Sequence, residues 1–145
     1  MIEKAIYNIL STNAQLSTTQ ISFGNLPNMT SGGDFIVFYR INTEANDTKT
    51  GNAIGTINLK SGLSTLDTAS IQCNIYSPSA ERVAILAETV RGALDRTSGT
   101  FNGVVVQSIQ FTNEASLFDF NDSYNPKGIY QMNQSYSCRT EPQYL

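Results

Sequence analysis

Residues 71–96 read IQCNIYSPSAERVAILAETVRGALDR, and this stretch decides the fold. Apolar and polar residues alternate at its start, which predicts a β-strand over 69–76 with one packed face. A Ser-Pro-Ser corner follows, where we expect Ser77 as the N-cap and Pro78 at the first helical position. An apolar stripe then repeats at helical spacing as far as about Arg96. The stretch therefore predicts a strand that turns directly into a helix packed on its own sheet.

The same patterns place the remaining elements of the chain. An apolar face at helical spacing predicts a helix over 2–11. Further strands are predicted at 35–41, 103–112 and 128–138, the first of them buried on both faces. Residues 114–122 are ambiguous, with a turn and a short strand at 117–120 as one interpretation. The order predicts an α+β fold in which a mainly antiparallel sheet carries two helices on one face.

Residues 43–68 form the least core-like part of the chain. They contain three glycines and many small polar residues, and a short hairpin at 53–59 is one form open to them. Loops of this length in compact domains are usually functional or disordered. We expect one domain over 1–145, in which 43–68 is an extended loop or an arm that becomes ordered against a partner.

The composition limits the classes of partner. Only 14% of the residues are charged, the formal net charge is −3, and the nine basic residues are scattered along the chain. Nucleic-acid binding needs clustered Lys and Arg, so we expect no tight binding of DNA. The N-terminus lacks the basic start and apolar run of a signal peptide, and no stretch reaches the roughly 20 apolar residues that span a membrane. The many Ser, Thr, Asn and Gln residues suit either a surface covered by neighbours or a loop-rich monomer.

The sequence offers little catalytic chemistry. It has no histidine, which is the commonest general base and metal ligand. Cys73 and Cys138 are too few for a structural zinc site and are expected to be buried thiols on neighbouring strands, without a disulfide. The acidic group at 119–122 could hold a cation, but a turn stabilised by Asn and Asp explains it more simply. The Lys60-Ser61 pair is interpreted as solvated, and we expect no enzyme activity, cofactor or metal.

One residue departs from the pattern of the 80–96 helix. Ile85 projects opposite the apolar stripe, and Gly92 beside it leaves room for another chain to approach. An isolated exposed isoleucine is common, so Ile85 is either a stray surface residue or a contact with a partner. The candidate interface residues are Ile85, Arg82, Thr89, Gly92 and Tyr76, with Asn52, Ile54, Ile57 and Leu59 of the 43–68 segment.

Several stretches resemble the tail terminator (tail completion) family of long-tailed bacteriophages. They are IEKAIYNIL, FIVFYRI and above all SIQCNIYSPSAERVAILAETVRGALDR, and GVVVQSIQF and NDSYNPKGIYQMNQSYSC are similar to the family pattern too. The resemblance covers about residues 1–42 and 66–139. Its most specific part is the strand, Ser-Pro corner and helix that ends in Val-Arg-x-Ala-Leu-Asp.

The resemblance implies a non-enzymatic α+β subunit that assembles with copies of itself into a hexameric ring. Such a ring caps the head-proximal end of the tail tube, stops its polymerisation and joins the head-side connector protein, while DNA passes through the pore without specific binding. It implies a place in the virion, with assembly in the host cytoplasm and no membrane contact. Two alternatives stay open, namely a neck or head-completion ring protein of the connector and a small enzyme or ligand-binding domain.

Overall fold

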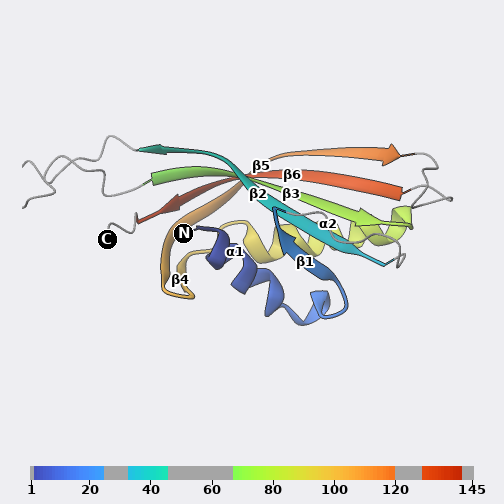
Figure 1. Cartoon of the computed structure of the whole chain (residues 1–145), viewed down its shortest axis with the longest axis horizontal. Coiled ribbons are helices and arrows are strands. Elements are labelled where there is room, and N and C mark those ends of the chain that lie inside the picture. The colour runs from blue at the N-terminus through green and yellow to red at the C-terminus, as the bar shows by residue number, and fades with distance from the viewer. Residues whose placement is uncertain (1, 25–32, 46–66, 120–128, 142–145) are drawn as a thin grey trace, which may run out of the picture.

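The computed structural model describes residues 2–24, 33–45, 67–119 and 129–141 (Figure 1). Its elements are α1 (Ile2–Ser11), η1 (Ala14–Leu16), β1 (Gln20–Phe23), β2 (Phe35–Ala45), β3 (Asp67–Ser77), α2 (Ala80–Leu94), β4 (Gly99–Phe101), β5 (Val104–Asp119) and β6 (Ile129–Thr140). Within these residues the strands form a six-stranded sheet in the order β1-β2-β3-β6-β5-β4. β1 and β2 are parallel, and the other neighbouring pairs are antiparallel. The fold is therefore α+β, which confirms the predicted class.

The main core lies between the two helices and one face of the sheet. Both helices lie on the same side of the long strands in Figure 1. α1 buries Ile6 and Leu10, and the apolar stripe predicted for α2 is buried as well. The largest strand residues that meet the helices are Ile36, Phe38, Ile71, Ile75, Ile109 and Tyr136. Burying a large apolar side chain stabilises a fold by about 1.5–3 kcal/mol, so this layer holds the helices on the sheet.

The corner between β3 and α2 differs in detail from the prediction. β3 extends to Ser77, which is buried, and α2 begins at Ala80. The N-cap is Ser79, whose backbone is extended and whose hydroxyl oxygen accepts a hydrogen bond from the Arg82 N–H at 3.3 Å. The expected cap at Ser77 is wrong because the strand pairing continues through that residue. Its hydroxyl oxygen instead accepts from the Ser79 N–H at 3.3 Å and stabilises the turn.

The end of α2 also differs, since the helix stops at Leu94 and not at about Arg96. Arg96 has a φ of 63°, outside the right-handed helical region. Its N–H donates to the Ile109 carbonyl at 2.7 Å, and the Ile109 N–H donates to the Thr97 carbonyl at 3.1 Å. The helix ends early because the chain after it binds along β5.

The strands around the 43–68 segment are longer than predicted. β2 continues to Ala45 and β3 begins at Asp67, so both ends of that segment are strand and not loop. β2 is buried on both faces only over 35–38, and Ile41 is 56% exposed. The rest of the segment lies outside the described residues, with the expected hairpin at 53–59, the Lys60-Ser61 pair and the candidates Asn52, Ile54, Ile57 and Leu59.

Two further differences concern β5 and the sheet edges. β5 runs to Asp119 without a turn. For residues 114–119, the interpretation as a turn followed by a separate strand is therefore wrong. Residues 120–122 lie outside the described part of the chain. The sequence patterns missed β1, η1 and β4, which are three or four residues long and show too little periodicity to be recognised.

Candidate functional site

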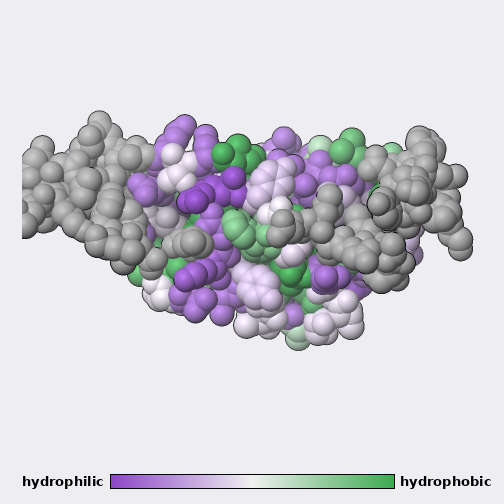
Figure 2. Space-filling view, in the orientation of Figure 1, coloured by the Kyte–Doolittle hydropathy of each residue, from purple (hydrophilic) through white to green (hydrophobic). Residues whose placement is uncertain are grey.

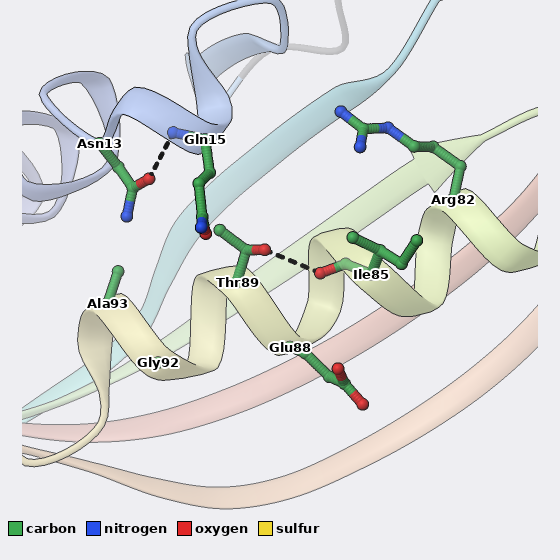
Figure 3. Close-up of a pocket in the computed structure, with 8 residues that line it drawn as sticks. All are labelled: Asn13, Gln15, Arg82, Ile85, Glu88, Thr89, Gly92 and Ala93. Carbon is green, nitrogen blue, oxygen red and sulfur yellow. Dashed lines mark hydrogen bonds between the residues drawn. The ribbon is translucent and has the colours of Figure 1, made fainter.

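An open groove of about 720 Å³ lies between α2 and η1 (Figure 3). Its lining residues are Asn13, Gln15, Arg82, Ile85, Glu88, Thr89, Gly92 and Ala93. Ile85 is 45% exposed there, and a side chain added at Gly92 would meet no atom within 4 Å. Three of the predicted interface residues therefore share the groove with Ile85, and the space over Gly92 is open to another chain.

The polar groups of the groove are largely held within the chain. The Thr89 hydroxyl donates to the Ile85 carbonyl at 2.9 Å, and Asn13 Oδ1 accepts from the Gln15 N–H at 2.9 Å. Gln15 points across the groove toward Thr89 in Figure 3, whereas Glu88 points away. Ile85 is thus the one large apolar side chain in a lining that is otherwise mostly polar or small.

Arg82 is engaged at the end of this groove. Its Nε lies 2.8 Å from Asp34 Oδ2, which joins the first turn of α2 to the residue before β2. The side chains of Arg82 and Asp34 are 37% and 18% exposed. A partly exposed pair of this kind contributes little to stability, so its main effect is to orient the helix.

Tyr76, one of the candidate interface residues, does not lie on an exposed surface. It is 9% exposed and packs in a second apolar cluster with Phe35, Val37 and Ile129. Phe35 is its register partner on β2, so apolar residues of neighbouring strands meet at this end of the sheet. Tyr76 became a candidate because it shares the alternate face of its strand with Gln72 and Asn74, and this alternation does not reveal the apolar residues on the strands beside it.

The sheet face opposite the helices carries the apolar cluster around Tyr76 at one end. Over the rest of β3 and β6 it is polar, and we call this part the polar sheet face. It alternates with the core residues of β3 and β6, and its members are Ser70, Gln72, Asn74, Gln131, Asn133, Ser135 and Ser137. Gln72 Nε2 donates to Asn74 Oδ1 at 2.9 Å, and Gln131 Nε2 donates to Asn133 Oδ1 at 2.7 Å. These amides and hydroxyls carry no formal charge, and they would offer little attraction to a polyanion.

Charge on the described part of the polar sheet face occurs toward one end. There Thr68 of β3 pairs with Glu44 of β2 and Arg139 of β6, so the two charges are of opposite sign. Figure 2 shows one side of the molecule, where hydrophilic residues predominate and hydrophobic ones occur in small separate groups. Among the described residues, the polar sheet face has no basic patch of the kind that retention of DNA requires.

A buried polar network on the helix side escaped the sequence patterns. Gln134 is fully buried, and its Nε2 donates to the Ala87 carbonyl and to Glu114 Oε1, both at 2.9 Å. The Tyr136 hydroxyl donates to Gln134 Oε1 at 2.7 Å. Burial raises the pKa of Tyr136, which keeps this donor protonated. The network joins α2, β5 and β6. Gln134 is a polar residue at a position of β6 where the alternation predicts an apolar one, and this interruption was the signal in the sequence that could have revealed the network.

The two cysteines are free, buried and on the neighbouring strands β3 and β6, as predicted. Burial raises the pKa of Cys73, and it raises the pKa of Cys138 to about 12. Both groups are therefore thiols near neutral pH and poor nucleophiles. Among the described residues there is no group of three or more His, Cys, Asp or Glu side chains that could hold a metal ion. Nor does any helix in those ranges have the length and apolar character to cross a bilayer.

Comparison with known proteins gives matches at the level of structure. No protein-family model matches the chain, and no curated protein sequence matches it significantly. A chain from the virion of a native gene transfer agent particle is similar, with a TM-score of 0.62 and 12% identity over 95% of this chain and 92% of that one. A second solved chain has a TM-score of 0.54 and 12% identity over 99% of this chain and 92% of that one. The fold of this chain is therefore one that also occurs in a gene transfer agent particle.

Proposed function

We propose that this protein is a structural subunit of a phage-like particle, which closes into a ring at the head-proximal end of the tail tube. The ring stops polymerisation of the tube and forms the joining surface to the head connector, and DNA passes through its pore. Two findings support this function. The fold occurs over almost the whole length of a chain in a gene transfer agent virion. The stretch 70–96 also resembles tail terminators.

The observation that carries the proposal is the division of the sheet into two faces. One face is covered by both helices. The other carries the polar sheet face, most of whose amides and hydroxyls are partly exposed, beside the apolar cluster around Tyr76. A conduit for DNA needs a surface that is wetted but does not hold phosphates, because retained DNA could not be transferred. Lys and Arg would bind the backbone through release of counterions, and this face has Ser, Asn and Gln instead.

A ring requires two different surfaces on each subunit, because a self-complementary surface closes after two copies. The groove around Ile85 is one candidate for such a surface. Stable interfaces bury about 800 Å² per partner, so the groove needs a second contact region beside it. A ring of six is the number that the family resemblance implies.

The proposal is tested by measuring the mass of the purified full chain, free and mixed with tail tubes, followed by electron microscopy. We expect a ring with a pore of at least about 20 Å, the width of a DNA duplex that must pass it. We also expect the ring at tube ends. A chain that stays monomeric under both conditions would falsify the proposal. Binding to filled heads and not to tube ends would instead identify a neck or head-completion ring.

A further inference from the structure

The sheet has two long edges that no described strand covers. β1 pairs with residues 35–38 of β2, and β4 pairs with residues 104–106 of β5. The chain after α2 covers β5 only as far as Phe111, whose N–H donates to Asp95 Oδ1 at 3.0 Å. Within the described ranges, residues 39–45 of β2 and 112–117 of β5 therefore have a neighbouring strand on one side only. We call these segments the β2 edge and the β5 edge.

We infer that the β5 edge of one copy pairs with the β2 edge of the next copy, so that a continuous sheet runs from subunit to subunit. This inference rests on the proposed ring and specifies the contact that closes it. The successive antiparallel pairs β2–β3, β3–β6 and β6–β5 give β2 and β5 opposite directions. Two copies placed side by side in the same orientation therefore bring these edges together as an antiparallel pair, the form that short strand additions favour.

The two edges lie on opposite sides of the sheet and toward opposite ends of it. Arg40, Ile71, Tyr136 and Phe111 form one row across the four long strands. The β2 edge lies mostly on one side of this row, and the β5 edge lies on the other. Counted in paired rows, two neighbouring copies must therefore be shifted by about four to five residues along the strands for the edges to meet. At about 3.3 Å per residue this shift is roughly 15 Å.

A shift of this size is compatible with closure into a ring. Four strands spaced about 4.8 Å apart are roughly 19 Å wide, so the shift is about four-fifths of the width of each copy. This ratio corresponds to strands tilted by about 38° from the ring axis. Closed barrels have tilts of about 35–45° and need such a stagger between strands. The diagonal placement of the edges thus fits a closed ring better than a flat array.

The side chains of the two edges also favour pairing. Each edge carries one large exposed apolar residue, Ile41 at 56% and Leu117 at 53%, which a joined sheet would cover. Neither edge contains Lys or Pro, the residues that most often protect open strands from association. Each edge also adjoins an irregularity in register, between Arg40 and Asn42 and between Phe111 and Asn113, where a strand can bend.

Cysteine cross-linking of the full chain tests the inference. Asn42→Cys is combined in turn with Asn113→Cys, Ala115→Cys or Leu117→Cys, which sample one face of the β5 edge in neighbouring registers. The native thiols do not interfere, because both are buried. After oxidation we expect at least one pair to give a ladder of covalent oligomers that ends at the ring size. Asn42→Cys with Glu81→Cys on α2 is the matched control and should stay monomeric on a denaturing gel.

The outcomes separate this inference from the proposed function. Mixing the two single-cysteine variants of the reactive pair should give covalent dimers and nothing larger. A ring that forms by mass but shows no cross-link with any of the three pairs overturns the edge pairing and leaves the ring intact. If one single-cysteine variant alone gives mainly covalent homodimers, the proposed pairing of the β5 edge with the β2 edge is also overturned, because identical edges would then meet across a two-fold axis. A chain that forms no assembly contradicts both proposals.

Discussion

At the scale of single residues, Gln134 shows how much one buried amide can determine. Its side chain contacts a helix carbonyl, a carboxylate on β5 and a tyrosine hydroxyl on its own strand. A buried hydrogen bond contributes little net stability while both partners are present, but a partner left unpaired costs about 1–3 kcal/mol. Gln134 therefore acts less as a source of stability than as a constraint on where α2 can lie.

Replacing this residue should be costly in a way that a surface amide is not. Gln134→Leu removes the partners of the Tyr136 hydroxyl and the Ala87 carbonyl, so we expect the free energy of unfolding to fall by about 1–3 kcal/mol. The control Gln131→Leu acts on a partly exposed amide and should change stability by about 0.5 kcal/mol or less. Urea unfolding at equal protein concentration measures both. Equal losses in the two variants would show that the network has no special role.

The buried thiols predict a dependence of stability on alkaline pH. Burial raises the pKa of both from the ordinary value of 9.0, that of Cys138 to about 12. The folded state thus holds these protons more tightly than the unfolded state does. The stabilisation that the protonated thiols contribute is therefore complete below about pH 9 and is lost as the pH rises toward 12. The slope is at most about 1.4 kcal/mol per pH unit for each thiol. Denaturant unfolding between pH 8 and 11 measures how steeply the free energy of unfolding falls with pH. This slope should be smaller in Cys138→Ala than in the unmodified chain. An unchanged slope would show that Cys138 does not cause the pH dependence.

At the scale of elements, α2 depends on a cap that the sequence placed two residues too early. We expect Ser79→Ala to lower the free energy of unfolding by about 1 kcal/mol, since the Arg82 N–H loses its acceptor. Ser98→Ala, in an exposed residue beyond the helix, is the control and should be nearly neutral. Chemical unfolding monitored by circular dichroism compares the two. A larger effect of Ser98→Ala would rule out Ser79 as the main cap.

How far the sequence could predict these elements depended on whether their pattern was local. α1, the strand 69–76 and the stripe of α2 each present one apolar face, and all three were found. β1 forms because residues 20–23 pair with β2 across an intervening segment, which periodicity does not report. The second half of β5 was not recognised because residues 112–117 are exposed on both faces and do not alternate in polarity. The open edges inferred to pair between copies are therefore the part that sequence reasoning predicted least well.

At the scale of the whole molecule, the helix side and the strand edges offer separate contacts to neighbouring copies. Ile85→Asp places a charge in the groove, and we expect normal circular dichroism but at least tenfold weaker assembly, equivalent to about 1.4 kcal/mol. Ala84→Asp is the matched control, because Ala84 is exposed on the same helix and does not line the groove. Sedimentation at several concentrations gives the assembly constants. Normal rings from Ile85→Asp would show that the groove is not a subunit contact.

The last prediction concerns the polar sheet face as the surface that DNA passes. Ser135→Lys with Ser137→Lys places two cations on this face of β6, and each ring then carries them once per subunit. The unmodified ring should not retain duplex DNA, whereas the lysine variant should bind it with an affinity that falls steeply with salt. Ser11→Lys with Ala84→Lys adds the same charge at exposed positions on the two helices, on the other side of the sheet, and tests for attraction by net charge alone. DNA retention on immobilised rings, measured across a salt series, compares the unmodified ring with the two lysine variants. Equal retention by the two variants would mean that this face does not line the pore, since only a surface around the DNA gives its lysines simultaneous access to many phosphates.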